Sequence, residues 1–162
     1  MAQAHYTKTT FALAMIAGAA VIVASYRAVP AQTAAVQVRS VWDGVYTGAQ
    51  AGNGAKFYVS DCASCHGKQL EGIDDAPALA GKEFMESWDG RTLGALLAQM
   101  RKMPRDAPGR FSSAEYADTM AYILSVNKFP AGKSDLPQEI EVLRQIRLEA
   151  TKSTPAVPAP KK

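Results

Sequence analysis

Three stretches of the chain carry inward-facing residues at helical spacing, and each follows a residue that can cap a helix. Thr47 and Gln50 have the spacing of a capping box, and Ser112 and Glu115 repeat it. Thr92 can cap the stretch between them. Spacings of three and four residues are typical of helices with one buried face. The three faces consist of Ala51, Ala55, Tyr58 and Cys62; Leu93, Leu96, Leu97 and Met100; and Tyr116, Met120, Ile123 and Asn127.

The segments between these stretches are rich in Gly, Asp and Pro, which predicts loops over residues 67–81 and 102–109. A further amphipathic stretch runs from Leu136 to about Ala150 and predicts another helix. Gly54 lies on the inner side of the first helix, where a missing side chain would let another helix approach closely. No stretch alternates between apolar and polar residues, so we expect an all-α fold.

The N-terminal 31 residues have the pattern of a secretory signal peptide. Lys8 precedes an apolar run over residues 11–24, and small residues follow up to Ala31. We expect cleavage after Ala31 and export to the periplasm. A retained membrane anchor is the alternative, although the run of 14 residues is short beside the roughly 20 that a spanning helix needs. N-terminal sequencing of the mature protein distinguishes the two.

Composition and charge add modest bounds. The 48% hydrophobic content includes the apolar N-terminus, and the formal charge of +3 falls to about +1 after residue 31, where 16 basic and 15 acidic residues remain. A near-neutral domain gives no indication of nucleic-acid binding. The pattern divides the chain into a signal peptide (1–31), a leader segment (32–45), a central domain (46–133), an additional amphipathic helix (134–150) and a disordered proline-rich tail (151–162).

The central domain contains the run Cys62-Ala-Ser-Cys65-His66, which holds both cysteines of the chain and one of its two histidines. Cys-x-x-Cys-His is the attachment signature of c-type haem, so Cys62 and Cys65 are predicted to form two thioether bonds to one haem. His66 would be the proximal iron ligand. Three other interpretations compete. A zinc site would need more Cys or His ligands than the chain has. A thioredoxin-like dithiol would follow a strand, and a plain disulfide would leave His66 unexplained.

The sixth iron ligand is predicted to be a methionine, because the other histidine, His5, lies in the predicted signal peptide. A His/Met pair raises the potential of a haem. The candidates are Met85, Met100, Met103 and Met120. We favour Met103, because it lies in a predicted loop, is followed by the helix-breaking Pro104, and is 37 residues beyond His66. Met100 and Met120 lie on predicted apolar faces and have the pattern of core residues.

The chain resembles class I, mono-haem cytochromes c in three segments: the haem motif, Pro77-Ala-Leu79 and Met103-Pro104. The segments Val41–Thr47, Trp88–Leu93 and Met103–Gly109 resemble, more narrowly, small periplasmic cytochromes that occur alone or fused to quinoprotein dehydrogenases. The resemblance covers roughly Ser40 to Leu136 and implies a cytochrome c fold around one covalent haem.

The resemblance also implies roles for residues around the haem. The Pro77 carbonyl would accept a hydrogen bond from the His66 ring, and Leu79 would pack on the proximal haem face. Trp88 and Arg91 would reach a haem propionate; the alternative for Arg91 is a solvated charge at a helix start. Two further roles concern packing: Phe57 and Tyr58 would lie where the first and last helices of the domain cross, and Trp42 would pack the entry segment onto the domain.

These features predict an electron carrier rather than an enzyme. With both axial positions filled, the protein would pass electrons from a periplasmic dehydrogenase to an oxidase or another cytochrome, and haem-attachment machinery would be a further partner. A membrane contact is expected only if the N-terminal segment is retained. One alternative is a bound subunit of an oxidoreductase complex that docks through Ile140, Leu143 and Ile146, although this segment could instead wrap the domain's own surface. The other alternative is a five-coordinate haem sensor or enzyme.

Overall fold

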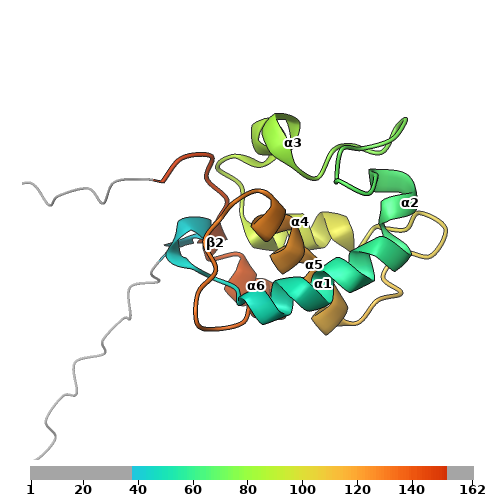
Figure 1. Ribbon diagram of the computed structural model, residues 1–162. Helices are drawn as coiled ribbons and strands as arrows, with labels where there is room; N and C mark the ends of the chain where they lie inside the picture. Colours follow the sequence, from blue (N-terminus) through green and yellow to red (C-terminus); the bar gives the residue numbers. More distant parts are fainter. Residues whose placement is uncertain (1–37, 153–162) are drawn as a thin grey trace, which may run out of the picture. The chain divides into compact units, whose positions relative to one another are not determined.

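The computed structural model describes residues 38–152, which form six α-helices and one short pair of strands (Figure 1). The predicted signal peptide, the first part of the leader segment and most of the proline-rich tail lie outside these residues. No helix within residues 38–152 is long and apolar enough to span a membrane. In chain order the elements are β1 (Arg39–Ser40), a 3-10 helix (Val41–Asp43), α1 (Gly48–Asp61), α2 (Ala63–His66), α3 (Gly81–Trp88), α4 (Leu93–Met100), α5 (Ser113–Val126), α6 (Ile140–Leu143) and β2 (Ile146–Arg147).

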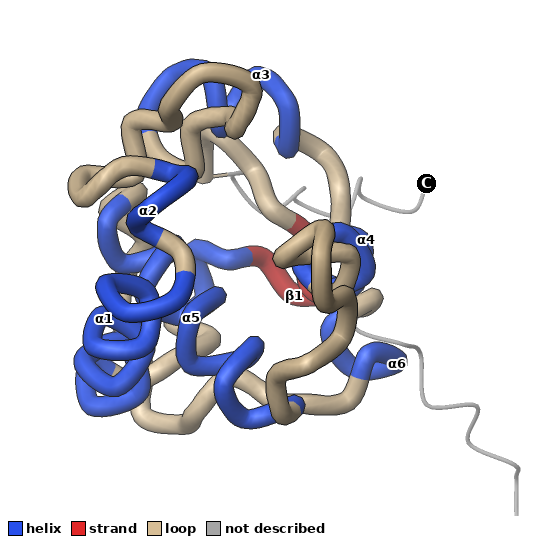
Figure 2. Tube along the Cα trace, turned by 90° about the vertical axis from the view of Figure 1, so that its right-hand side faces the viewer, coloured by secondary structure: helices blue, strands red, loops and turns tan. Residues whose placement is uncertain are grey.

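Helices α1 and α5 lie side by side and share the largest interface between two elements (Figures 1 and 2). Gly54 is buried at this interface, and a Cβ atom at Gly54 would overlap the backbone carbonyl of Asp118 in α5. Farther along the interface, the rings of Tyr58 and Tyr122 lie 5.3 Å apart. The close approach predicted at Gly54 is therefore confirmed, as is the position of Tyr58 at the helix crossing.

Gly54→Ala is expected to lower the free energy of unfolding by roughly 1–3 kcal/mol, because the backbone of α5 must move to admit the methyl group. Gly52→Ala is the matched control in the same helix: a Cβ there meets nothing within 4 Å, so the helix gains up to about 1 kcal/mol. Chemical denaturation of both variants measures the two changes. Equal effects of the two substitutions would contradict the packing described at Gly54.

The predicted helix starts at Thr47, Thr92 and Ser112 are confirmed, since each side chain accepts a hydrogen bond from the third residue after it. Ser112 and Glu115 form the complete capping box. Thr47 and Gln50 do not, because the Gln50 side chain exchanges two hydrogen bonds with the backbone of Leu136 instead. Gln50 is buried, so this pairing fastens the start of α1 to the C-terminal segment.

The helix predicted over 134–150 is wrong. The structure has only the single turn α6 and the strand β2 in this segment, which lies along the domain itself. The inward-facing residues change from helical spacing, at Leu136 and Leu143, to alternation at Ile146 and Leu148, and all four are buried. The partner-docking contacts predicted at Leu143 and Ile146 are therefore used inside the domain. We call residues 136–150 the C-terminal strap.

The all-α prediction holds apart from this strand, which pairs in parallel with β1. The entry segment is packed as predicted: the Trp42 ring makes an edge contact with Phe129 at 5.0 Å between centroids, and its Nε1–H donates to the Glu149 carbonyl. Helix α3 was not predicted. The residue before it, Ala80, has no side chain that could cap the helix. The Gly81 N–H instead donates a hydrogen bond to the side chain of Asn127 at the C-terminal end of α5.

Candidate haem site

The two cysteines lie at the end of α1, where the chain bends into the single turn α2. Cys62 is the junction between the two helices and is half-buried, whereas Cys65 is exposed, and both are free thiols. Gly67 ends the turn with a φ of 79°, which a residue with a side chain rarely adopts. The Tyr58 hydroxyl donates to the Gly67 carbonyl at 2.6 Å, and burial raises the pKa of Tyr58, which keeps it protonated as a donor. Tyr58 of α1 thus holds the end of the turn that carries both thiols.

The environment of Cys62 does not fit the dithiol alternative. Burial raises the pKa of the Cys62 thiol to about 11; the Asp61 carboxylate adds to the effect and Arg110 opposes it. Redox-active dithiols have a lowered pKa, because the thiolate is the nucleophile. The motif also follows a helix rather than a strand. A zinc site finds no support either, since no group of three potential ligands from His, Cys, Asp or Glu comes together within residues 38–152.

The His66 ring is held by the loop that follows it. His66 Nδ1 lies 2.8 Å from the Pro77 carbonyl oxygen, so the contact predicted between these residues is present. A carbonyl only accepts, so Nδ1 carries the proton and donates. The other ring nitrogen, Nε2, is then the one with a lone pair for a metal. Two backbone bonds fold the loop back: Gly72 N–H to the His66 carbonyl, and Leu79 N–H to the Leu70 carbonyl.

A set of apolar side chains from separate segments packs on the core but stays only partly buried. Its members come from the motif, the end of the following loop, α3, the end of α4 and the segment before α5. They are Cys62, Leu79, Ala80, Met85, Trp88, Met100 and Phe111. Burying apolar surface is favourable, so a large apolar group that covers this lining would stabilise the domain. The lining, the two free thiols and the oriented imidazole together fit a covalently attached haem.

The four candidate methionines have distinct environments. Met120 is fully buried in α5 and belongs to the core, as its position on the apolar face indicated. Met85 lies in α3 and Met100 is the last residue of α4; both are partly buried. Met103 is half-buried in the connection between α4 and α5, as predicted, and its N–H donates to the Met100 carbonyl. The turn after α4 therefore fixes the backbone of Met103.

Comparison with known families decides what kind of domain this is. Residues 49–123 match the family model described as cytochrome c oxidase, cbb3-type, subunit III. This range includes the haem motif and Met103, and it lies within the helical domain described above. The chain contains a class I c-type cytochrome domain. The search of curated proteins found no match. The search of solved structures found none either.

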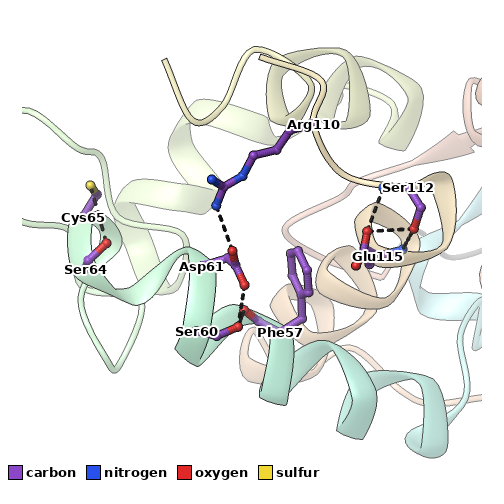
Figure 3. A network of polar contacts seen from close by, with 8 residues as sticks. All are labelled: Phe57, Ser60, Asp61, Ser64, Cys65, Arg110, Ser112 and Glu115. Atoms are coloured by element: carbon purple, nitrogen blue, oxygen red, sulfur yellow. Dashed lines mark hydrogen bonds and ion pairs between the residues drawn. The ribbon is translucent and has the colours of Figure 1, made fainter. Parts of the chain in front are cut away.

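The rim of the cytochrome's haem site contains an ion pair that the sequence did not indicate. Arg110 Nη2 donates to Asp61 Oδ1 at 2.8 Å, next to the cysteine-bearing turn (Figure 3). The neighbouring Phe111 ring makes an edge contact with Phe57 at 4.8 Å between centroids. These two contacts fasten the segment after Met103 to the end of α1. Their partners are about fifty residues apart, so no local pattern could reveal them.

Asn127 is a second residue of the cytochrome domain whose contacts sequence reasoning missed. The helical spacing predicts it on the inner face of the last helix, but it is the C-cap of α5 and its amide reaches the segment that follows the His66 loop. Its Nδ2–H donates to the Leu79 carbonyl at 3.0 Å, and its Oδ1 accepts from the Gly81 N–H. Asn127 therefore holds Leu79 and the start of α3 against α5.

Trp88 and Arg91 come together at the turn between α3 and α4. The Arg91 guanidinium carbon lies 4.3 Å from the centroid of the Trp88 ring. Trp88 is half-buried and Arg91 is exposed. Their predicted contact with a haem propionate stays a prediction, as do the ligand role of Met103 and the packing of Leu79 on the proximal haem face.

Proposed function

We propose that the protein is a periplasmic electron carrier with one covalently bound haem c, attached at Cys62 and Cys65 and ligated by His66 and Met103. When bound, the haem iron supplies a one-electron Fe(II)/Fe(III) couple. The observation that carries the proposal is the hydrogen bond from His66 Nδ1 to Pro77, beside two free thiols on one helical turn. It orients the imidazole as a ligand, and such outer contacts raise ligand basicity and tune the metal.

The contacts of this chain's residues suit electron transfer rather than catalysis. The partly buried apolar side chains near the motif would cover part of a bound haem, and an apolar surrounding limits solvent rearrangement when the charge changes. Cys65 is exposed, so the edge of the site beside it reaches the surface where a partner can dock. Redox encounters tend to use small and weak interfaces. We infer that electrons enter and leave beside Cys65.

Carbon monoxide tests the proposal against the five-coordinate alternative. If both axial positions are filled, carbon monoxide added to the reduced protein at neutral pH is expected to leave the absorption spectrum unchanged. Met103→Gly serves as the positive control, because it would open one position. Stoichiometric binding of carbon monoxide by the unaltered protein would show that the sensor or enzyme interpretation is the correct one.

For the electron donor and acceptor we propose only the class of protein. The resemblance to cytochromes of quinoprotein dehydrogenases favours a periplasmic dehydrogenase as donor, with an oxidase or another cytochrome as acceptor. The description of the matching family model favours a second candidate, a bound subunit of an oxidase complex. Separation of the periplasmic and membrane fractions discriminates them: a free carrier is expected in the periplasm, and a bound subunit with the oxidase in the membrane.

A further inference from the structure

The C-terminal strap forms the middle of a three-segment ladder. On one side β2 pairs in parallel with β1, so that Arg39 is opposite Ile146. On the other side the backbone of Leu148 exchanges two hydrogen bonds of 2.8 Å with the turn between α3 and α4: it accepts from the Gly90 N–H and donates to the Arg91 carbonyl. The strap itself is anchored, because Ile146 and Leu148 are fully buried. This part of the chain lies beyond the segment that matches the family model.

Two side-chain contacts add to this backbone pairing. The Ala150 N–H donates to Asp89 Oδ1 at 2.8 Å, and Arg147 Nη2 donates to the Gly90 carbonyl at 2.9 Å. Four hydrogen bonds from the strap thus hold a turn of three residues, Asp89 to Arg91. A turn fixed at this many points keeps the side chains at its ends in one place.

Arg91 is the last residue of this turn, and Trp88, the last residue of α3, directly precedes it. Trp88 is one of the partly buried apolar side chains that would surround the haem, and Arg91 stacks on its ring. The Arg91 side chain donates a hydrogen bond to the Ser87 carbonyl at 3.4 Å, and Arg91 forms no ion pair with a carboxylate within residues 38–152. A guanidinium fixed at the rim of a site, with no acidic partner there, is suited to a carboxylate of the group that occupies the site. Haem carries two such groups, its propionates.

We propose that the strap, through residues 147–150, positions Arg91 against a haem propionate and thereby raises the reduction potential. The inference rests on the proposed function, because it requires the bound haem. A positive charge close to the iron favours the form that has gained an electron. Arg91 supplies this charge; Asp89 and the strap act through Arg91 and are positioning residues.

Asp89→Ala and Asp89→Asn form a matched pair that isolates the strap contact. Both remove the same negative charge, but asparagine keeps an oxygen that accepts from the Ala150 N–H. We expect Asp89→Ala to shift the equilibrium between reduced and oxidised protein about threefold toward the oxidised form relative to Asp89→Asn, because Arg91 is freed to move into solvent and its charge then acts less strongly on the haem. Spectroscopic redox titration of the haem-loaded protein measures this, and a melting curve of each variant shows that both are folded.

The Arg91→Ala background tests whether the strap acts through Arg91. In that background the two Asp89 variants are expected to have equal reduction potentials, because a residue that acts only through Arg91 has no effect once Arg91 is gone. Equal potentials in the unaltered background would overturn the proposal. So would a difference that persists without Arg91, or variants that change only the rate with a redox partner. Failure of the proposed function is seen separately, in the carbon monoxide response of the unaltered protein.

Discussion

Serine at both Cys62 and Cys65 is expected to abolish covalent haem attachment completely. The thioether bonds need the two thiols, and within the chain no other cysteine can replace them. The half-buried Cys62 and the exposed Cys65 lie on one helical turn ended by Gly67, so both can face the same haem edge. A single replacement leaves one thioether bond and lowers the yield of holoprotein. The intact mass of protein from a host with haem-attachment machinery measures the outcome.

Ser64→Ala is the matched control for the cysteine variants. It changes an exposed residue of the same turn, whose side chain makes only a long contact with the Cys65 sulfur (Figure 3). The control is expected to carry haem to the same extent as the unaltered protein. Haem mass retained on the double serine variant under denaturing conditions would contradict the assignment of the motif.

Met103→Ala is expected to abolish the weak near-infrared iron–sulfur band and to lower the reduction potential by on the order of 0.1 V, within the range that axial ligands control. The thioether stabilises the reduced iron, and alanine offers no ligand in its place. The half-buried position of Met103 in the connection after α4 supports this role, since a ligand on a loop leaves the packed helices undisturbed. Absorption spectra and a redox titration measure both changes.

Met100→Ala is the control that decides between the two nearest candidates. Met100 is the last residue of α4 and packs partly on the core, so its loss is expected to cost stability but to keep the iron–sulfur band. If the band disappears in Met100→Ala and persists in Met103→Ala, the ligand is Met100. Replacing a fully buried methionine with alanine costs about 2–5 kcal/mol of unfolding free energy. Met100 is only half-buried, so we expect a smaller loss of stability in Met100→Ala.

Local signals in the sequence predicted the features that depend on a few neighbouring residues. The caps at Thr47, Thr92 and Ser112 begin helices in the structure, because a side-chain oxygen that accepts from the third residue needs no distant partner. The motif with its histidine, and the glycine at the crossing of α1 and α5, are local in the same sense. The loop position of Met103 followed from Pro104 and from the end of the preceding apolar pattern.

Contacts between distant segments decided what the sequence could not show. Helix α3 lacks a local cap because Asn127 supplies the acceptor for its first N–H from 46 residues away. The spacing of Leu136 and Leu143 predicts a helix, whereas pairing with β1 and with the Asp89–Arg91 turn makes the strap extended at Ile146. Gln50 does not complete the capping box with Thr47, because its side chain forms two hydrogen bonds with the backbone of Leu136.

The fold of the strap changes how its role is understood. With Leu143 and Ile146 buried in the domain, the strap has little apolar surface left for a partner, and Val142 is its one large apolar residue that is exposed. Deleting the strap would therefore disturb the cytochrome domain itself, so loss of a partner after such a deletion would not identify a docking surface. Substitutions at Val142, which leave the buried face intact, are the better probe of docking.

Redox titration of the purified protein, combined with its intact mass, tests whether the domain carries a covalent, His/Met-ligated haem that transfers one electron. We expect one covalently attached haem per chain and a reversible one-electron transition, with the spectrum of a six-coordinate His/Met haem in both states. A chain that gains no haem mass in a host able to attach haem, or a haem that is five-coordinate when reduced, would contradict it.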